Sequence, residues 1–204
     1  GQGKGADFQL NQPWDVTGTM DRLFIAMAGA NQVWEYDLGQ ARLRCLAGSS
    51  ELGITDGPAR SAMFAHPAAL VQVQQMLYVA DAATSAVRAV QTGQGQVQTL
   101  VGQGLYDFGD QDGQRRDARL QLPLGLALDP NSPVLWVADA YNGSLRRLRL
   151  GGGDMGTHEL PQALEQPSAL AAAGGSLWIA NSGAHEVLRL DLGSGKLVRL
   201  PIGE

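Results

Sequence analysis

Charged side chains and cysteine are both scarce in this 204-residue sequence, which has a formal net charge of −5. Asp, Glu, Lys and Arg make up 17% of the residues, below the roughly 25% of an average soluble domain. The single cysteine, Cys45, can form no internal disulfide and cannot supply a zinc site that needs several cysteines. A disulfide-rich scaffold is therefore excluded. The single cysteine does not indicate whether the protein works in an oxidising or a reducing compartment.

Long apolar runs and clustered positive charge are also missing. No run approaches the ~20 residues of a membrane-spanning helix, and residues 1–10 lack the basic start and apolar centre of a signal peptide. Net acidity argues against binding to a phosphate backbone, which needs clustered Lys and Arg. We expect neither a membrane nor a nucleic-acid partner, and we slightly favour the cytoplasm as the location.

Glycine, in contrast, is abundant, with 27 residues, about twice the usual share of ~7%. The sequence also repeats itself. Four segments read Leu, aromatic, β-branched, Ala, and each follows a proline by about ten residues. The segments are Leu23–Ala26, Leu77–Ala80, Leu135–Ala138 and Leu177–Ala180, and the prolines are Pro13, Pro67, Pro123 and Pro167.

The spacing of these repeats predicts the fold. Successive prolines lie 54, 56 and 44 residues apart, and a period of about 50 residues fits one four-stranded unit. In the third repeat we expect strands at 124–128, 134–139 and 144–150 and a short one near 157–160, separated by turn formers. We predict an all-β protein, a β-propeller of four-stranded antiparallel blades. The glycines then supply the tight turns that join the strands.

We expect one propeller region over residues 1–204, with blades at 13–47, 67–101, 123–160 and 167–201 and connectors at 48–66, 102–122 and 161–166. The two long connectors share an Asp-Gly pair, which we expect to form a turn, and an Ala-x-Phe or Ala-x-Leu segment, whose apolar side chain we expect between blades. The first residues, through Gly1, Gly3, Phe8 and Leu10, look like the tail of a third such connector.

These features resemble the NHL repeat. The resemblance rests on Asp56-Gly57, Ala62-x-Phe64, Pro67 and Leu77–Asp81, and again on Pro123–Ala127 and Val137–Asn142. It covers essentially the whole chain and is strongest to relatives of NHL repeat-containing protein 2, in which a thioredoxin-like domain precedes a six-bladed propeller. It therefore implies that these four blades are part of a six-bladed ring. The Cys-x-x-Cys of the companion domain is absent, and the repeat's Asp is replaced by Met27 in the first copy and Asn181 in the fourth.

Polar residues that could carry chemistry are few and scattered. His66, His158 and His185 occupy three different repeat positions, so we expect no shared metal and no cofactor. Asp110-x-Asp112-Gly113 imitates part of a calcium loop but lacks carboxylates at both ends of the motif. The arginines at 115, 116, 119, 146, 147 and 149 form the one basic concentration of the sequence, and those at 115, 116 and 119 alternate with four aspartates. We interpret them as a self-neutralised surface, with Arg146 and Arg149 pointing outward.

Trp14 and Asp15 are the candidate ligand-binding residues, because they replace small residues at the start of an innermost strand. The leading hypothesis is a non-catalytic scaffold that binds an unidentified protein or small molecule, and the sequence shows no catalytic residues. The alternative is a channel-active propeller enzyme of the lyase or lactone hydrolase type. We further expect a fragment of a larger protein that self-associates through exposed blade faces; a closed four-bladed ring is the other possibility.

Overall fold

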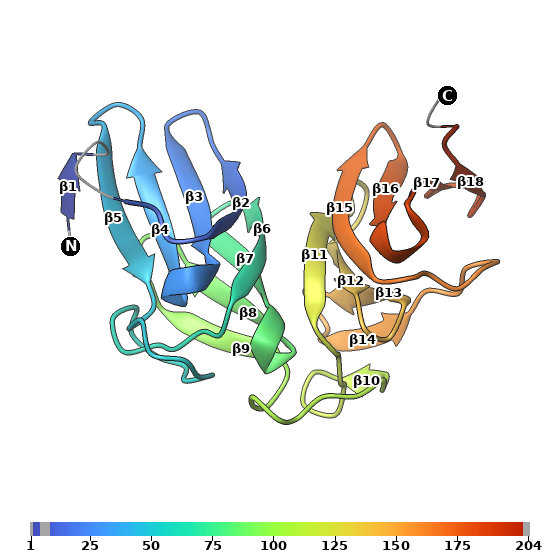
Figure 1. The fold of residues 1–204 in the computed structure, drawn as a ribbon, viewed down its shortest axis with the longest axis horizontal. Coiled ribbons are helices and arrows are strands. Elements are labelled where there is room, and N and C mark those ends of the chain that lie inside the picture. Colours follow the sequence, from blue (N-terminus) through green and yellow to red (C-terminus); the bar gives the residue numbers. More distant parts are fainter. Residues whose placement is uncertain (1, 5–8, 202–204) are drawn as a thin grey trace.

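The structure, a computed structural model, describes residues 2–4 and 9–201 and consists almost entirely of antiparallel strands. Four sheets follow one another along the chain, and the innermost strand of each begins at a repeat proline (Figure 1). We call these sheets blades 1 to 4. Blade 1 contains β2 (Pro13–Gly18), β3 (Arg22–Met27), β4 (Gln32–Asp37) and β5 (Arg42–Ala47). Blade 2 contains β6 (Pro67–Val73), β7 (Met76–Asp81), β8 (Ala86–Gln91) and β9 (Val97–Val101).

The last two blades repeat this order of strands. Blade 3 contains β11 (Pro123–Leu128), β12 (Val134–Asp139), β13 (Ser144–Arg149) and β14 (Asp154–Thr157). Blade 4 contains β15 (Pro167–Ala173), β16 (Ser176–Asn181), β17 (Glu186–Asp191) and β18 (Leu197–Arg199). The predicted fold class, all-β with four-stranded antiparallel blades, is confirmed.

The fourth strand of blade 3 lies earlier than the sequence predicted. We expected it near 157–160, whereas β14 spans Asp154–Thr157. It starts directly after the Gly151–Gly153 turn, and this register pairs Met155 with Leu148 and buries both side chains. The apolar pairing therefore decides the register, because a slip by one residue would turn Met155 toward solvent.

Two of the sheets carry a fifth strand at their outer edge. β1 (Gln2–Lys4) pairs with β5, and β10 (Gly113–Gln114) pairs with β14. Gly3 and Gly113 each lie ten residues before a repeat proline, and Gly57, at the same place in the first connector, forms an isolated bridge with Val97. The chain start thus matches the connectors, as the sequence indicated, although Gly1 and Phe8 lie outside the described residues.

Short 3-10 turns link the second strand of a blade to the third. They are η2 (Ala28–Ala30), η3 (Ala82–Thr84) and η4 (Ser182–Ala184). Each ends on a residue with a left-handed backbone, Asn31, Ser85 or His185, with φ between 51° and 56°. In blade 3 this place is taken by Gly143 at φ 61°, and glycine adopts this conformation most easily.

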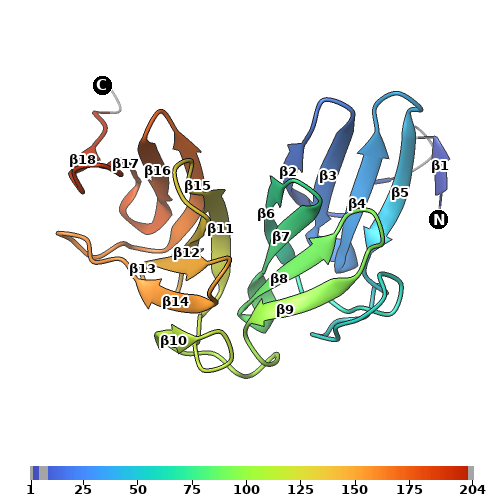
Figure 2. The ribbon, with the colours of Figure 1, turned by 180° about the vertical axis from the view of Figure 1, so that it is seen from behind.

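The blades pack side by side through their innermost strands. β2 packs against β6, β6 against β11, and β11 against β15, whereas the described strands of blades 1 and 4 make no extensive contact with each other. The result is an open arc with the two ends of the chain at opposite edges, as Figure 1 and the view from behind in Figure 2 show.

Apolar residues from the connectors fill the space between blades. Phe64 lies in the core between blades 1 and 2 and Leu120 in the core between blades 2 and 3, and both are completely buried together with Ala62 and Ala118. Leu164 takes the same place between blades 3 and 4. The predicted insertion of an apolar connector residue between blades is confirmed. In the part of the chain that the structure describes, no helix is long and apolar enough to cross a membrane.

Candidate functional site

Trp14 owes its position to a β-bulge. The pairing of β2 with β3 shifts register between Pro13 and Asp15, which leaves Trp14 as the extra residue. A bulge redirects the side chain of the extra residue, and the Trp14 side chain is exposed, at 53%. The same shift occurs after the first proline of every blade, where Ala68, Leu124 and Ser168 are the extra residues. The innermost strand of blade 1 therefore presents an indole where the other blades carry smaller side chains.

Asp15 connects two blades. One carboxylate oxygen accepts a hydrogen bond from the backbone N–H of Val16 (2.8 Å), and the other accepts one from the N–H of Leu70 on β6 (2.7 Å). Burial raises the pKa of Asp15, and these two hydrogen bonds oppose the increase. The corresponding residue of blade 3, Gly125, lies so close to β15 that an added Cβ would come within 2.9 Å of Ala169 Cα. Asp15 thus joins blades 1 and 2 by a hydrogen bond, at the position where Gly125 of blade 3 allows close backbone contact with blade 4. Its ligand-binding role stays a prediction.

Arg146 is completely buried, so its predicted outward position is wrong. Its guanidinium donates to Asp139 (2.9 Å), to Asp110 (2.9 Å) and to Asp112 (2.7 Å). Arg149 is exposed, as expected. Arg146 shares a face of β13 with Leu148, opposite Leu145, and the strand pattern alone does not tell whether that face is covered at Arg146. Two of its three partners, Asp110 and Asp112, come from a connector more than thirty residues away, and the sequence gives no direct signal for that contact.

The acidic residues of the second connector thereby find a structural role. Asp112 also accepts hydrogen bonds from the N–H and the hydroxyl of Thr157 on β14 (3.0 and 2.9 Å), and Asp107 pairs with Arg119 at 2.7 Å. The Asp-Gly pair that we expected to form a turn instead ties the connector to the outermost strand, since Gly113 pairs in β10. We call Arg146 together with its three partners Asp110, Asp112 and Asp139 a clamp, because these ion pairs hold the connector on the blade.

Blade 2 contains the same clamp. Arg88 is completely buried and donates to Asp81 (3.3 Å) and Asp56 (2.8 Å). Asp56 also accepts from the N–H and hydroxyl of Thr99 (3.0 and 2.7 Å). The guanidinium further lies 5.0 Å from the centre of the Phe64 ring. The clamp therefore holds the connector, the blade and the residue inserted between blades together.

The buried aspartates of both clamps also bind the backbone just before the first strand of their blades. Asp81 accepts from the N–H of Ala65, and Asp139 from that of Gln121, at 2.7 Å in both cases. Asn181 accepts the equivalent bond from Glu165 at 2.6 Å. The side-chain amide of Asn181 therefore keeps the hydrogen bond to the backbone that Asp makes in blades 2 and 3. Leu188 stands in blade 4 where these blades carry the buried arginine.

Burial is the main influence on the buried carboxyls. It raises the pKa of Asp81 to about 7 and that of Asp139 to about 6, against the opposing effects of the paired arginines and the hydrogen bonds. Such shifts often mark catalytic groups, but structural ion pairs produce them as well. Here each carboxyl is enclosed by its arginine and a backbone donor and is completely buried. No room is left at either carboxyl for a substrate.

The histidines lie apart, as their repeat positions predicted. His66 precedes Pro67 and donates its N–H to Asn31 (3.1 Å). His158 packs edge-on against Trp136, 5.1 Å between ring centres, and burial lowers the pKa of His158. His185 is exposed beside η4. The described residues contain no group of three His, Cys, Asp or Glu side chains that could hold a metal.

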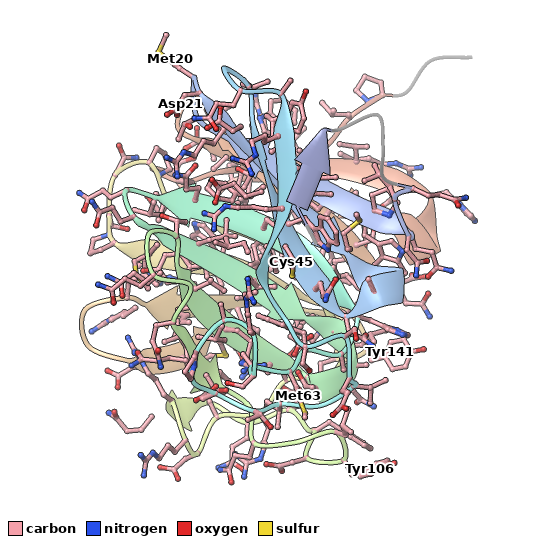
Figure 3. The ribbon with its side chains drawn as sticks, turned by 90° about the vertical axis from the view of Figure 1, so that its left-hand side faces the viewer. Met20, Asp21, Cys45, Met63, Tyr106 and Tyr141 are labelled. Carbon is pink, nitrogen blue, oxygen red and sulfur yellow. The ribbon has the colours of Figure 1, made fainter. Side chains whose placement is uncertain are left out.

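Exposed aromatic side chains gather where the second connector meets blade 3. Tyr106, Phe108 and Tyr141 are 91%, 54% and 62% exposed, and we call them the aromatic loop surface. Asn142, next to Tyr141, donates to the carbonyl of Gly109, next to Phe108, at 2.7 Å. Figure 3 shows Tyr106 at the lower end of the molecule and Tyr141 above it on the same side, with Met20 and Asp21 at the upper end. Sequence reasoning missed this surface, because the pairing of the two segments is not visible in the sequence.

Solved structures with a similar fold are numerous. An auxiliary nutrient binding protein from Bacteroides ovatus aligns with a TM-score of 0.69 at 11% identity, covering 96% of this chain and 43% of that protein. Virginiamycin B lyase from Staphylococcus aureus aligns with a TM-score of 0.55 at 16% identity, covering 94% of this chain and 71% of the lyase. Likeness at such identities concerns the fold alone. Together with the four sheets and the bonds between them, it places the chain among proteins with a β-propeller fold.

Curated relatives show which known proteins the sequence resembles. The chain is 32% identical to NHL repeat-containing protein 2 of Gallus gallus over 99% of its own length and 34% of that protein. It is 29% identical to Protein SUPPRESSOR OF QUENCHING 1, chloroplastic, of Arabidopsis thaliana, over 95% of its own length and 21% of that protein. No protein-family model matches. The chain is therefore similar to the NHL-repeat protein NHL repeat-containing protein 2 over nearly its whole length, and it spans about a third of that relative's length.

Proposed function

We propose that this chain is a non-catalytic NHL propeller scaffold that binds a protein partner through the aromatic loop surface. The observation that carries the proposal is the exposure of Tyr106 and Phe108 on a connector that is otherwise firmly held, and of Tyr141 on the adjoining turn between β12 and β13. Exposed aromatic side chains are enriched at the centres of protein interfaces. A rigid scaffold that presents loops is a common arrangement for binding.

The use of the polar groups supports a binding role over catalysis. Arg88 and Arg146 are enclosed by carboxylates and backbone carbonyls, and buried Glu35 is paired with Arg22 (3.2 Å) and Arg44 (2.5 Å). These groups stabilise the blades and their connectors. The bonds of Asp110 and Asp112 to Arg146 already restrict the second connector. The connector therefore loses less conformational entropy on binding, which favours affinity.

The partner's chemistry follows from the neighbours of the aromatic residues. Asp107 and Asp110 flank Phe108, and Asp110 remains 57% exposed although it pairs with Arg146. We expect a segment that combines apolar or aromatic side chains with lysine or arginine. Trp14 and Asp15 form a second candidate surface for a small ligand, supported by the exposure of the indole.

The test is selection from a random peptide display library against the chain. We expect enriched peptides with basic and aromatic residues, whose binding falls at least tenfold on a Tyr106→Ser, Phe108→Ser, Tyr141→Ser triple variant. The matched control is Met20→Ser with Leu38→Ser, two exposed apolar residues of blade 1, which should leave binding unchanged. Peptides that bind the triple variant and the wild type equally, or that lose binding only with Trp14→Ala, would contradict the proposal for the aromatic loop surface.

A further inference from the structure

Each of the two long connectors forms a cleft with the outermost strand of the blade before it. The first cleft, of about 350 Å³, opens beside β5, and the second, of about 450 Å³, opens beside β9. Equivalent positions of the repeat line both clefts. Among them are Leu46, Gly48 and Arg60 in the first cleft and Leu100, Gly102 and Arg116 in the second. The two clefts are therefore copies of one feature of the repeat.

A glycine directly after the strand shapes each cleft. Gly48 and Gly102 have φ values of 110° and 99°, which residues with a Cβ rarely adopt. A Cβ on Gly48 would lie 2.7 Å from the carbonyl oxygen of Asn31, and one on Gly102 would lie 2.7 Å from the Cβ of Ala86. The chain thus turns tightly against its own blade, and the cleft stays open between this turn and the arginine of the connector.

Each cleft carries one positive charge in excess, although the net charge of the chain is −5. Arg60 is the only charged side chain among the described residues that line the first cleft. Arg115 and Arg116 line the second cleft together with one carboxylate, that of Asp56. The clefts are therefore two positively charged places on an acidic protein.

The guanidiniums of Arg60 and Arg116 are accessible to a ligand. Both side chains are exposed, and neither takes part in an ion pair within the part of the chain that the structure describes. The hydrogen bond from Gln103 to Arg116 ends on the backbone carbonyl of Arg116. Arg115, in contrast, already donates to the carbonyl of Leu150 (2.7 Å). A ligand can therefore reach N–H donors of Arg60 and Arg116.

We propose that the two clefts bind carboxylates of an acidic segment of a partner protein, one at Arg60 and one at Arg116. A guanidinium can bind a carboxylate through two parallel hydrogen bonds. One surplus positive charge matches the single charge of a carboxylate, whereas a phosphate group carries roughly two negative charges. These clefts use other residues than the aromatic loop surface, for which we expect a basic partner, and their role goes beyond the proposed function.

The open shape of the clefts favours a protein segment over a free small molecule. A small ligand is usually held in an enclosed pocket that buries most of its surface. The exposed arginines leave both clefts open toward solvent, and arginine is enriched where proteins bind one another. A side chain that projects from a larger partner can reach the guanidinium without being enclosed.

Fluorescence anisotropy with a labelled hexaglutamate peptide tests this proposal. We expect Arg60→Gln and Arg116→Gln each to weaken binding, and the double variant to weaken it about tenfold or more, because each substitution removes a charge-assisted pair. Lys196→Gln is the matched control, since it removes the same charge from an exposed side chain in the turn before β18, and it should bind like the wild type. Circular dichroism shows whether each variant is folded.

A phosphoserine peptide of the same total charge separates carboxylate from phosphate binding, and we expect it to bind more weakly than hexaglutamate. Stronger binding of that peptide would overturn the assignment to carboxylates. Equal hexaglutamate affinity of the wild type and the double variant, or an equal loss in Lys196→Gln, would show that the clefts are not the site. The Tyr106→Ser, Phe108→Ser, Tyr141→Ser triple variant should bind hexaglutamate like the wild type, which distinguishes failure of this proposal from failure of the aromatic loop surface.

Discussion

At the residue scale, the charged side chains that drew attention in the sequence stabilise the structure. Arg88 and Arg146 are buried against aspartates, and burying such pairs without further hydrogen bonds would be costly. Both guanidiniums also donate to backbone carbonyls, of Met63 and Thr55 for Arg88 and of Arg119 for Arg146. The pairs thereby bind residues of a connector to residues of the blade that follows it.

The raised pKa of Asp139 predicts how stability depends on pH. An acid with a pKa of about 6 when folded and ~3.9 when unfolded binds more protons in the folded state between these values. Its contribution to the free energy of unfolding therefore falls as the pH rises from 4 to 6. For Asp139→Asn we expect the stability difference, wild type minus variant, to shrink by about 2 kcal/mol over this range.

Urea unfolding at pH 4, 5 and 6 measures this difference. Asp117→Asn changes an exposed aspartate of the second connector and should show no such trend. A difference between wild type and Asp139→Asn that grows with pH would mean that the attraction of Arg146 outweighs burial and lowers the pKa of Asp139.

At the scale of elements, connectors are as important as strands. The proline register and the inserted apolar residues were predictable, because Phe64 and Leu120 repeat at one distance from Pro67 and Pro123. The clamps were not, because the alternation places Arg146 on the face of Leu148 but does not tell that the second connector covers it. The aromatic loop surface escaped prediction for a similar reason, since it depends on a hydrogen bond between Asn142 and Gly109.

Removing Asp112 should loosen the second connector selectively. Asp112→Ala deletes the bonds to Arg146 and Thr157, while Asp139 and Asp110 still compensate the guanidinium. Because the Asp112 side chain is about half exposed, we expect a loss of roughly 1–2 kcal/mol. Limited proteolysis within residues 103–119 should accelerate about tenfold, since cleavage follows the population of the open form.

Asp117→Ala is the matched control and should be cleaved at the wild-type rate, because Arg119 donates to the backbone carbonyl of Asp117, which the substitution keeps. Equal protection of the connector in Asp112→Ala and the wild type would show that Arg146 does not hold this loop.

At the scale of the whole molecule, the repeats explain both the fold and its open ends. The glycine excess and the low charge follow from repeated turns and stacked apolar faces. The sequence predicted four blades and their order, since the proline period is visible in it. Which faces are left uncovered depends on the packing of β2, β6, β11 and β15 into an arc that leaves blades 1 and 4 apart.

Amide hydrogen exchange tests the central claim most directly, because it reports protection segment by segment. The central claim is that the aromatic loop surface binds a partner. When a peptide selected on the wild type is added, amides of residues 103–119 and 140–143 will gain protection, whereas those of β2 and β15 will stay unchanged. Protection that appears in β2 and not in these two segments would contradict the account.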